Sequence, residues 1–445
     1  MKLKKTGWSF VIAFVMWGIT SCTTMADYDY SQINNALSTG DYEVVYQTLE
    51  EDASILYTKH DEVLYGLDKG LVSHYSGEFS RSNTELSEAE KKIYEYFTKS
   101  ISQSISSFLL NDTVVDYAGE TYEDIYTNFF MALNYIHMND MEGAFVEIRR
   151  FDNKLKTISA QYADLITQAN LSNKENGAET VSDYDIEFHN SALARYLSLI
   201  MYRSTGKLDS AEVDKKYIDS AFKMQPSLYN FPIPSAVSEE FCIPENLGRL
   251  NVFAFSGLSP IKVEEVMRIA SNDGSFYYKI ALPEMQRQNS VVYSGEVFVY
   301  NLQGELVANA NLEKMESIEN IAIDMFEQKK DLLYLKATAR SISKSVATSV
   351  WGSLADSETD VATASFFSLM QVVSAVSTEV SERADVRSSK FFPATAWVAG
   401  INVPAGEYNV TVVYKNSSGN IVKEEVFPVI VDLAELNLLE SICLR

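Results

Sequence analysis

Residues 225–244 read QPSLYNFPIPSAVSEEFCIP, and this stretch divides the chain into two halves of different pattern. It holds four of the nine prolines. Because proline fixes φ and lacks an N–H donor, the stretch favours a connector over a helix or a central strand. Apolar residues recur at helical spacing before it, as at Ile125, Phe129 and Leu133, and alternate with period two after it. We predict an α+β protein with a helical domain at 22–225, a connector at 226–248 and a β-rich domain at 249–445.

A short turn motif recurs four times in the helical half. Each copy has a glycine or asparagine, a charged residue, a bulky apolar residue and then a new helical pattern. The copies are Gly40-Asp41-Tyr42-Glu43, Gly77-Glu78-Phe79-Ser80, Asn139-Asp140-Met141-Glu142-Gly143-Ala144 and Gly206-Lys207-Leu208-Asp209-Ser210-Ala211. Glycine or asparagine at a helix C-terminus permits the left-handed conformation that reverses the chain. The copies begin 37, 62 and 67 residues apart, whereas a tetratricopeptide repeat has about 34 residues. We predict tetratricopeptide-like helix pairs in an irregular array.

The second half contains six segments with the alternation typical of strands. They are residues 250–255, 276–280, 291–300, 396–403, 409–414 and 421–427. By analogy, the turn Pro404-Ala405-Gly406-Glu407-Tyr408 followed by alternating valines suggests an immunoglobulin-like sandwich.

A helical insert is predicted between these strands, at about 317–383. In it Ser341, Ser345, Ser349 and Ser353 recur every four residues, which lets two helices approach closely. Residues 361–378 carry no charge and reach the minimum length of a membrane span, but seven of these 18 residues are Ser, Thr or Gln. We predict a buried helical hairpin; membrane-surface contact, self-association and a transmembrane helix are the alternatives.

The N-terminus has the features of a secretory signal peptide at 1–21. Lysines 2, 4 and 5 precede a short apolar run, and the small residues Thr20-Ser21 come directly before Cys22. This arrangement resembles a relaxed bacterial lipobox, in which the cysteine thiol receives a diacylglyceryl group. We therefore predict lipidation at Cys22; an ordinary signal peptide and a retained signal anchor are the alternatives. Cys242 and Cys443 remain, and whether they pair is left open.

The charge of the chain is strongly acidic. Lys+Arg number 37 and Asp+Glu 61, which gives a net charge of -24. Residues 22–240 hold 36 of the acids and 17 of the bases, so the acidity belongs mainly to the helical half. Such a field repels phosphate backbones, which argues against nucleic acid as a partner.

No catalytic motif stands out. The four histidines show no i, i+4 pair, and the sequence has no Gly-x-Ser-x-Gly elbow and no phosphate-binding loop. The acid cluster Glu120, Glu123 and Asp124 is interpreted as a solvated helix face. Arg149-Arg150, which follow Glu142 and Glu147, are interpreted as an ion-pair face. We predict a non-enzymatic protein with no metal or cofactor; an enzyme with an unrecognised carboxylate pair is the alternative.

Several segments resemble a family of uncharacterised bacterial envelope lipoproteins with a tetratricopeptide-like N-terminal half. The segments are residues 61–70, 74–79, 111–112, 117–120, 132–135, 384–388 and 404–408. The resemblance implies secretion, a lipid anchor and a non-enzymatic role. Polar residues within otherwise apolar helical stretches are the candidates for a recognition surface, with helix caps and intramolecular bonds as the alternative. They are Asn111, Asp112, Glu120, Asn134 and Arg149.

These observations favour a membrane-anchored scaffold on the periplasmic face of a bacterial membrane or on the cell surface. Its helical repeats would present a concave acidic surface to envelope proteins. The alternative is a binding protein for an envelope glycan or small ligand through the β-rich domain. An aromatic-lined pocket in the β half would favour that alternative, and an open helical groove would favour the scaffold. The partner, the membrane and the oligomeric state stay open.

Overall fold

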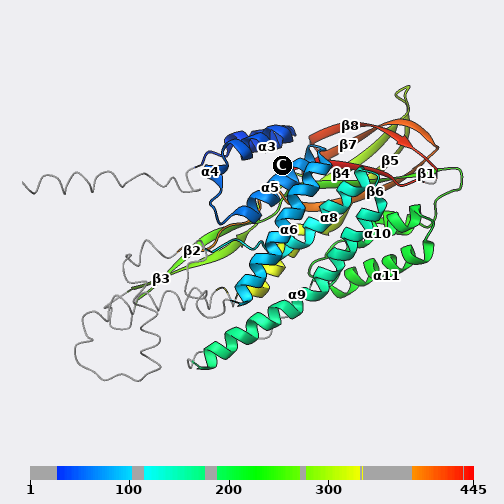
Figure 1. The fold of residues 1–445 in the computed structure, drawn as a ribbon. Coiled ribbons are helices and arrows are strands. Elements are labelled where there is room, and N and C mark those ends of the chain that lie inside the picture. Colours follow the sequence, from blue (N-terminus) through cyan, green and yellow to red (C-terminus); the bar gives the residue numbers. More distant parts are fainter. Residues whose placement is uncertain are drawn as a thin grey trace, which may run out of the picture.

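The computed structural model describes residues 28–102, 115–175, 188–270, 277–330, 333, 383–433 and 435–445. Within them the N-terminal half is helical and the C-terminal half is rich in strands, as the sequence predicts (Figure 1). The signal peptide, Cys22, Asn111 and Asp112 lie outside the described residues. So do the serine stripe and the uncharged stretch at 361–378. None of the described helices is both long and apolar enough to cross a membrane.

Four helix pairs follow one another along the helical half. They are α2 (Ser31–Thr39) with α3 (Tyr42–Glu51), α5 (Glu62–Tyr75) with α6 (Phe79–Ser102), α8 (Thr121–His137) with α9 (Met141–Glu175), and α10 (Ala192–Ser204) with α11 (Leu208–Met224). Two short helices, α4 (Ala53–Leu56) and α12 (Ser235–Glu239), lie in the connections. Neighbouring pairs touch through α3 and α5, α6 and α8, and α9 and α10.

The turn motif read from the sequence is confirmed in all four pairs. Gly40, Gly77, Asn139 and Gly206 have φ values of 83°, 79°, 59° and 74°. At the second turn the Glu78 N–H donates to the Ser73 carbonyl at 2.9 Å and the Gly77 N–H to the His74 carbonyl at 3.0 Å. This is the Schellman arrangement that closes a helix on a left-handed residue.

Helix α8 is the central helix of the core. The positions predicted to form its apolar face, Ile125, Phe129 and Leu133, are all fully buried. Its start is fixed by a capping box in which Glu120 precedes the helix and Glu123 bonds back to the Glu120 N–H at 2.7 Å.

Seven strands form one sheet in the order β8-β7-β4-β5-β6-β1-β9. They are β1 (Gly248–Leu258), β4 (Ser294–Tyr300), β5 (Leu306–Ser317), β6 (Pro393–Val403), β7 (Gly406–Lys415), β8 (Ile421–Val431) and β9 (Asn437–Cys443). All neighbours are antiparallel except β1 and β9, which pair in parallel. The sheet curls until its end strands approach, since Ser441 on β9 bonds Glu425 on β8 at 2.6 Å. This single curled sheet does not confirm the predicted immunoglobulin-like sandwich.

Each face of the sheet has its own core. Inside the curl, alternate residues such as Val252, Val412 and Cys443 form one apolar cluster. On the outer face, residues such as Phe255 and Val398 join the core of the helical half, and Phe255 packs against Phe130 of α8 with ring centroids 5.5 Å apart. The two halves therefore share a core, and β1 is buried on both faces along most of its length.

The proline-rich connector is packed into this shared core. The Tyr229 hydroxyl donates to Glu316 of β5 at 2.6 Å. Arg249, 2% exposed, donates from Nε to Glu240 at 3.1 Å. Cys242 is exposed and Cys443 is buried, and both are free thiols, so the open question of their pairing is answered in the negative.

A separate two-stranded hairpin, β2 (Ile261–Ala270) with β3 (Tyr277–Gln286), extends away from the curled sheet (Figure 1). Residues 318–330 are helical and begin the predicted insert. Strands β2, β5 and β9 were not among the segments predicted from alternation.

Candidate functional site

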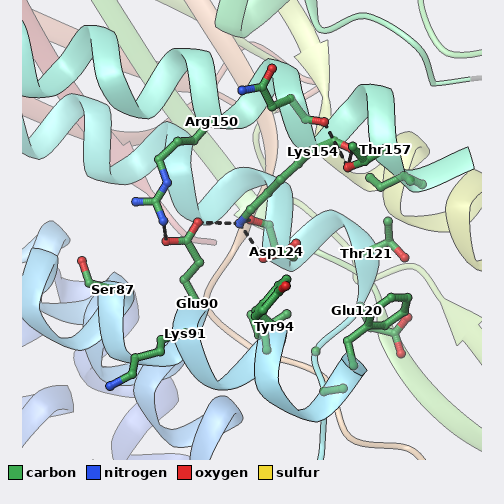
Figure 2. A pocket seen from close by; sticks show the side chains of 16 residues that line it. Ser87, Glu90, Lys91, Tyr94, Glu120, Thr121, Asp124, Arg150, Lys154 and Thr157 are labelled. Atoms are coloured by element: carbon green, nitrogen blue, oxygen red, sulfur yellow. Dashed lines mark hydrogen bonds and ion pairs between the residues drawn. The ribbon is translucent and has the colours of Figure 1, made fainter. Parts of the chain in front are cut away.

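A cavity of about 730 Å³ lies between α6 and α9, at the N-terminal end of α8 (Figure 2). We call it the helical groove. Helix α6 contributes Ser87, Glu90, Lys91, Ile93, Tyr94 and Phe97; the start of α8 contributes Ala118, Gly119, Glu120, Thr121 and Asp124; and α9 contributes Arg150, Asn153, Lys154, Thr157 and Ile158. The α9 residues at 150, 154 and 158 share one helix face, as do the α6 residues at 90, 94 and 97.

A chain of ion pairs crosses the groove. The Lys154 ammonium donates to Glu90 Oε1 at 2.8 Å and to Asp124 Oδ1 at 2.5 Å, and Arg150 bonds the other Glu90 oxygen at 2.5 Å (Figure 2). The buried Asn128 amide of α8 also donates to Glu90 at 2.9 Å. Arg150 also pairs with Glu147 at 3.1 Å, which confirms the ion-pair face predicted for this arginine.

The charges of the groove balance. Its carboxylates are Glu90, Glu120 and Asp124, and its cations are Lys91, Arg150 and Lys154. This groove is therefore not itself the concave acidic surface that the sequence analysis predicts, since its lining carries as many cations as carboxylates. A balanced, internally paired lining suits a segment of mixed composition better than a strongly basic one.

The two carboxylates that share Lys154 differ in protonation behaviour. Burial raises the pKa of Glu90, but the Lys154 and Arg150 charges outweigh burial and the net pKa is lowered. For Asp124 burial outweighs Lys154, and the pKa is raised. Close carboxylates in a cleft are the geometry that would favour an enzyme. Here one ammonium bonds both, so neither carboxylate is held free for a substrate.

The walls of the groove are apolar and aromatic. Ile93 and Ile158 are 6% and 5% exposed and form a buried base, whereas Tyr94 is 73% exposed. A lining that combines an exposed tyrosine, an arginine and buried aliphatic side chains has the composition found at the centre of protein interfaces.

Of the residues predicted as a recognition surface, the three that the structure describes do not lie at one site. Glu120 is 6% exposed and accepts bonds from Lys262 at 2.6 Å and from Lys329. Asn134 is fully buried. Both are bonded within the chain, which fits intramolecular bonding and not a recognition surface. Arg149 is exposed and lines a different cavity, between α9, α10 and α11.

Two of the segments that carry the family resemblance, 61–70 and 384–388, meet at one buried junction. Arg387 donates to Asp61 at 3.1 Å and to Asp385 at 2.9 Å. The Ser389 N–H donates to Glu123 at 2.6 Å. Burial, with the nearby Glu120, raises the pKa of Glu123 to about 7. This junction holds the helices against the chain that enters β6.

A second buried cluster joins the helices to β9. His74 lies between Asn134, whose Oδ1 is 2.6 Å from Nδ1, and Glu440, whose Oε1 is 2.6 Å from Nε2. The Asn134 amide donates to Ser82 and Asn83, so its oxygen must face the histidine. Because acceptors face both ring nitrogens, His74 is held in its protonated form. The other Glu440 oxygen bonds His137 at 2.9 Å.

The β half contributes a cavity of about 500 Å³ on strands β5 and β6. It is lined by Ser235, Glu239, Arg249, Ala308, Asn309, Ala310, Asn311, Glu313, Ala399, Gly400, Ile401 and Asn402. No aromatic ring belongs to this lining. Within the part of the chain that the structure describes, no three His, Cys, Asp or Glu side chains are grouped to hold a metal ion.

The groove itself was not predicted from the sequence. Tyr94 and Lys154 occupy ordinary positions of amphipathic helices, and only the i, i+4 spacing of Glu90 with Tyr94 and of Arg150 with Lys154 would have marked them.

Comparisons with models of protein families, with curated proteins and with solved structures find no match to this chain. The geometry of the groove is therefore the basis for a functional proposal.

Proposed function

We propose that this protein is a membrane-anchored, non-enzymatic scaffold whose helical groove binds a short segment of a partner protein. The observation that carries the proposal is Tyr94, 73% exposed on the wall of a cavity of about 730 Å³ between two helices. Removing an aromatic side chain of this size from water supplies binding free energy, and the fixed ion pairs beside it supply orientation.

The groove defines the chemistry of the partner. An apolar side chain of the partner would lie against Tyr94 and Phe97, above Ile93. Main-chain or amide groups of the partner would meet Thr121 and Asn153. Because the ion pairs of Glu90 and Lys154 are already formed, a strongly charged partner segment would have to break them at a cost in free energy. We therefore infer a partner segment of low net charge.

The proposed scaffold function also involves the arrangement of the helix pairs and the lipid anchor. We propose that the four helix pairs are an irregular tetratricopeptide-like array, which the shared Schellman turns and the pair-on-pair order support. We also propose that Cys22 carries the lipid and that the chain belongs among the envelope lipoproteins it resembles. A diacyl or triacyl cysteine would hold the protein stably on a membrane surface.

Binding of a glycan or small ligand through the β half remains the second proposal. The cavity on β5 and β6 offers Asn309, Asn311 and Asn402 as hydrogen-bonding groups. It lacks the aromatic lining that would have favoured a glycan site. The groove combines an aromatic anchor with a larger volume, so we favour the scaffold.

Site-specific photocrosslinking tests the proposal. A photoreactive phenylalanine analogue replaces Tyr94 in the full chain, expressed in its own envelope, and the same analogue replaces Tyr293 as the control. Tyr293 is 71% exposed and lies just before β4, on the other half of the molecule. We expect one defined protein crosslinked at position 94 and not at 293. Crosslinks to glycan alone, identical products from both positions, or no product at 94 would contradict the proposal.

A further inference from the structure

A second, smaller cavity of about 230 Å³ lies between α9, α10 and α11. It is lined by Phe145, Ile148, Arg149, Asp152, Arg195, Ser198, Tyr202, Ser210, Val213 and Asp214. Pockets for drug-sized ligands have volumes of about 300–1,000 Å³, so this one accommodates only a small molecule.

The cavity has one cation with no partner. Arg149 lines it and forms no hydrogen bond or ion pair with any residue in the described segments. The next residue, Arg150, faces the helical groove and is paired with Glu90 and Glu147. The two adjacent arginines of α9 therefore serve different cavities. An arginine fork without a carboxylate is the group that recognises a ligand carboxylate through two parallel hydrogen bonds.

The cavity also has a buried carboxylate that is only partly satisfied. Asp214 is 3% exposed, and its Oδ1 accepts from Arg195 at 3.2 Å. Its Oδ2 has no hydrogen-bond partner, although Ser198 stands close by. Asp152 shares Arg195, at 2.8 Å. Two carboxylates thus share one guanidinium, which leaves acceptor capacity for a further donor. An unsatisfied buried carboxylate oxygen costs free energy unless a ligand or water supplies that donor.

Apolar side chains complete the lining. Phe145 and Tyr202 are in ring contact, with centroids 4.6 Å apart and planes at 37°. Ile148 is 3% exposed, and Val213 is 49% exposed at the mouth. The cavity therefore offers a cation, a carboxylate and an apolar surface within a small volume.

We propose that this cavity binds a free α-amino acid with an apolar side chain, its carboxylate on Arg149, its ammonium on Asp214 Oδ2 and its side chain against Phe145 and Tyr202. The site is separate from the helical groove and does not depend on the proposed scaffold function. It adds a small zwitterionic ligand to a molecule that we otherwise propose to bind protein.

Calorimetric titration of the full chain in detergent tests this site with alanine, leucine and phenylalanine. We expect at least one of them to bind at millimolar concentration or below. The N-acetyl derivative of that amino acid lacks the ammonium, and its amide lacks the carboxylate. Each should bind at least about tenfold more weakly, because each removes one charge-assisted hydrogen-bonded pair. Absence of binding by all three amino acids, or binding of either derivative as tight as that of the parent amino acid, would overturn the proposal.

Two variants and a matched control assign the binding to the cavity. Arg149→Gln and Asp214→Asn should each weaken amino-acid binding at least about tenfold. Arg150→Gln, one residue along, should leave it unchanged while reducing the crosslinking at position 94. If Asp214→Asn does not fold, Arg149→Gln alone tests the site. This variant should fold, because Arg149 is exposed and bonds no residue in the described segments. Amino-acid binding that is insensitive to Arg149→Gln would refute the site without bearing on the groove.

Discussion

Replacing Glu440 by glutamine removes one charge from the cluster that joins the helical half to β9. Glu440 lies between His74 and His137, with bonds of 2.6 and 2.9 Å, and its side chain is 7% exposed. Glutamine has nearly the same shape, so packing is retained. The substitution leaves His74, which is fully enclosed, either as a cation without a counter-charge or as a neutral ring that has lost its partner.

Two arguments give the size of the effect. Burial alone would raise the pKa of Glu440, but the charges and bonds of His74 and His137 lower it to about 2. A carboxylate whose pKa falls from about 4.5 to about 2 contributes on the order of 3 kcal/mol to stability above pH 4.5. Independently, removing one partner of a buried ion pair costs about 3–5 kcal/mol. We expect Glu440→Gln to lower the free energy of unfolding by about 3 kcal/mol.

The effect must also depend on pH. The stabilisation from Glu440 is lost as pH falls through the range between its unfolded pKa and about 2. Burial lowers the pKa of His74, but Glu440 outweighs burial and the net pKa is raised. The contribution of His74 is therefore complete below its unfolded pKa and is lost as pH rises through its folded pKa. The difference between wild type and variant should be largest between about pH 4.5 and 6.5.

Denaturant unfolding followed by circular dichroism measures this difference at several pH values. Glu424→Gln on the exposed face of β8 is the matched control and should change stability by less than about 0.5 kcal/mol. A loss below about 1 kcal/mol near pH 6 for Glu440→Gln, or a loss that does not vary with pH, would refute the reasoning.

Three further predictions follow from the packing. Gly77→Ala should lower the free energy of unfolding by about 1 kcal/mol because Gly77 has a φ of 79°, and Gly77→Asn should lower it less because asparagine tolerates this conformation. Thermal unfolding measures both variants, and equal losses would contradict the backbone argument. Glu120→Gln should lower the free energy of unfolding by about 3 kcal/mol, because it breaks the buried ion pairs with Lys262 and Lys329. The two lysines outweigh burial and lower the pKa of Glu120, so the difference between wild type and variant should shrink as pH falls below about 4.5. A difference that does not change with pH would contradict this prediction. In the native protein a maleimide should label Cys242, which is exposed, and should not label Cys443, because burial raises the pKa of the Cys443 thiol to about 11. Mass spectrometry of the labelled peptides measures this, and rapid labelling of Cys443 would show that the curled sheet opens.

The sequence predicted what short-range chemistry determines. The left-handed residues Gly40, Gly77, Asn139 and Gly206 each mark a helix end, because a local conformational preference needs no knowledge of distant neighbours. Strands β1, β6, β7 and β8 alternate strongly enough to be recognised. Strand β9, with polar Asn437, Glu440 and Ser441, does not alternate clearly, because these residues are held by partners in the helices and in other strands.

The site could not be predicted in the same way. Glu120 and Asn134 are conspicuous in the sequence because they are polar within apolar stretches, yet that is the pattern of a buried side chain with a long-range partner. Tyr94 and Lys154 are inconspicuous because their environment arises only when α6 and α9 meet. The charge balance of the groove likewise depends on which of many acids the fold brings together. Composition describes the whole surface and not one cavity.

The parallel pairing of β1 with β9 has a consequence for the order of folding. These two strands begin and end the sheet in sequence, and the bond between His74 and Glu440 spans 366 residues. The helix pairs form through local contacts and can be compact early, but the free edge of β1 and the cation at His74 await a strand made much later. Contacts of such sequence separation slow folding and leave apolar surface uncovered in the interval. We expect the nascent helical half to be a client of chaperones until β9 arrives, and the docking of β9 to be the slow, committing step of maturation.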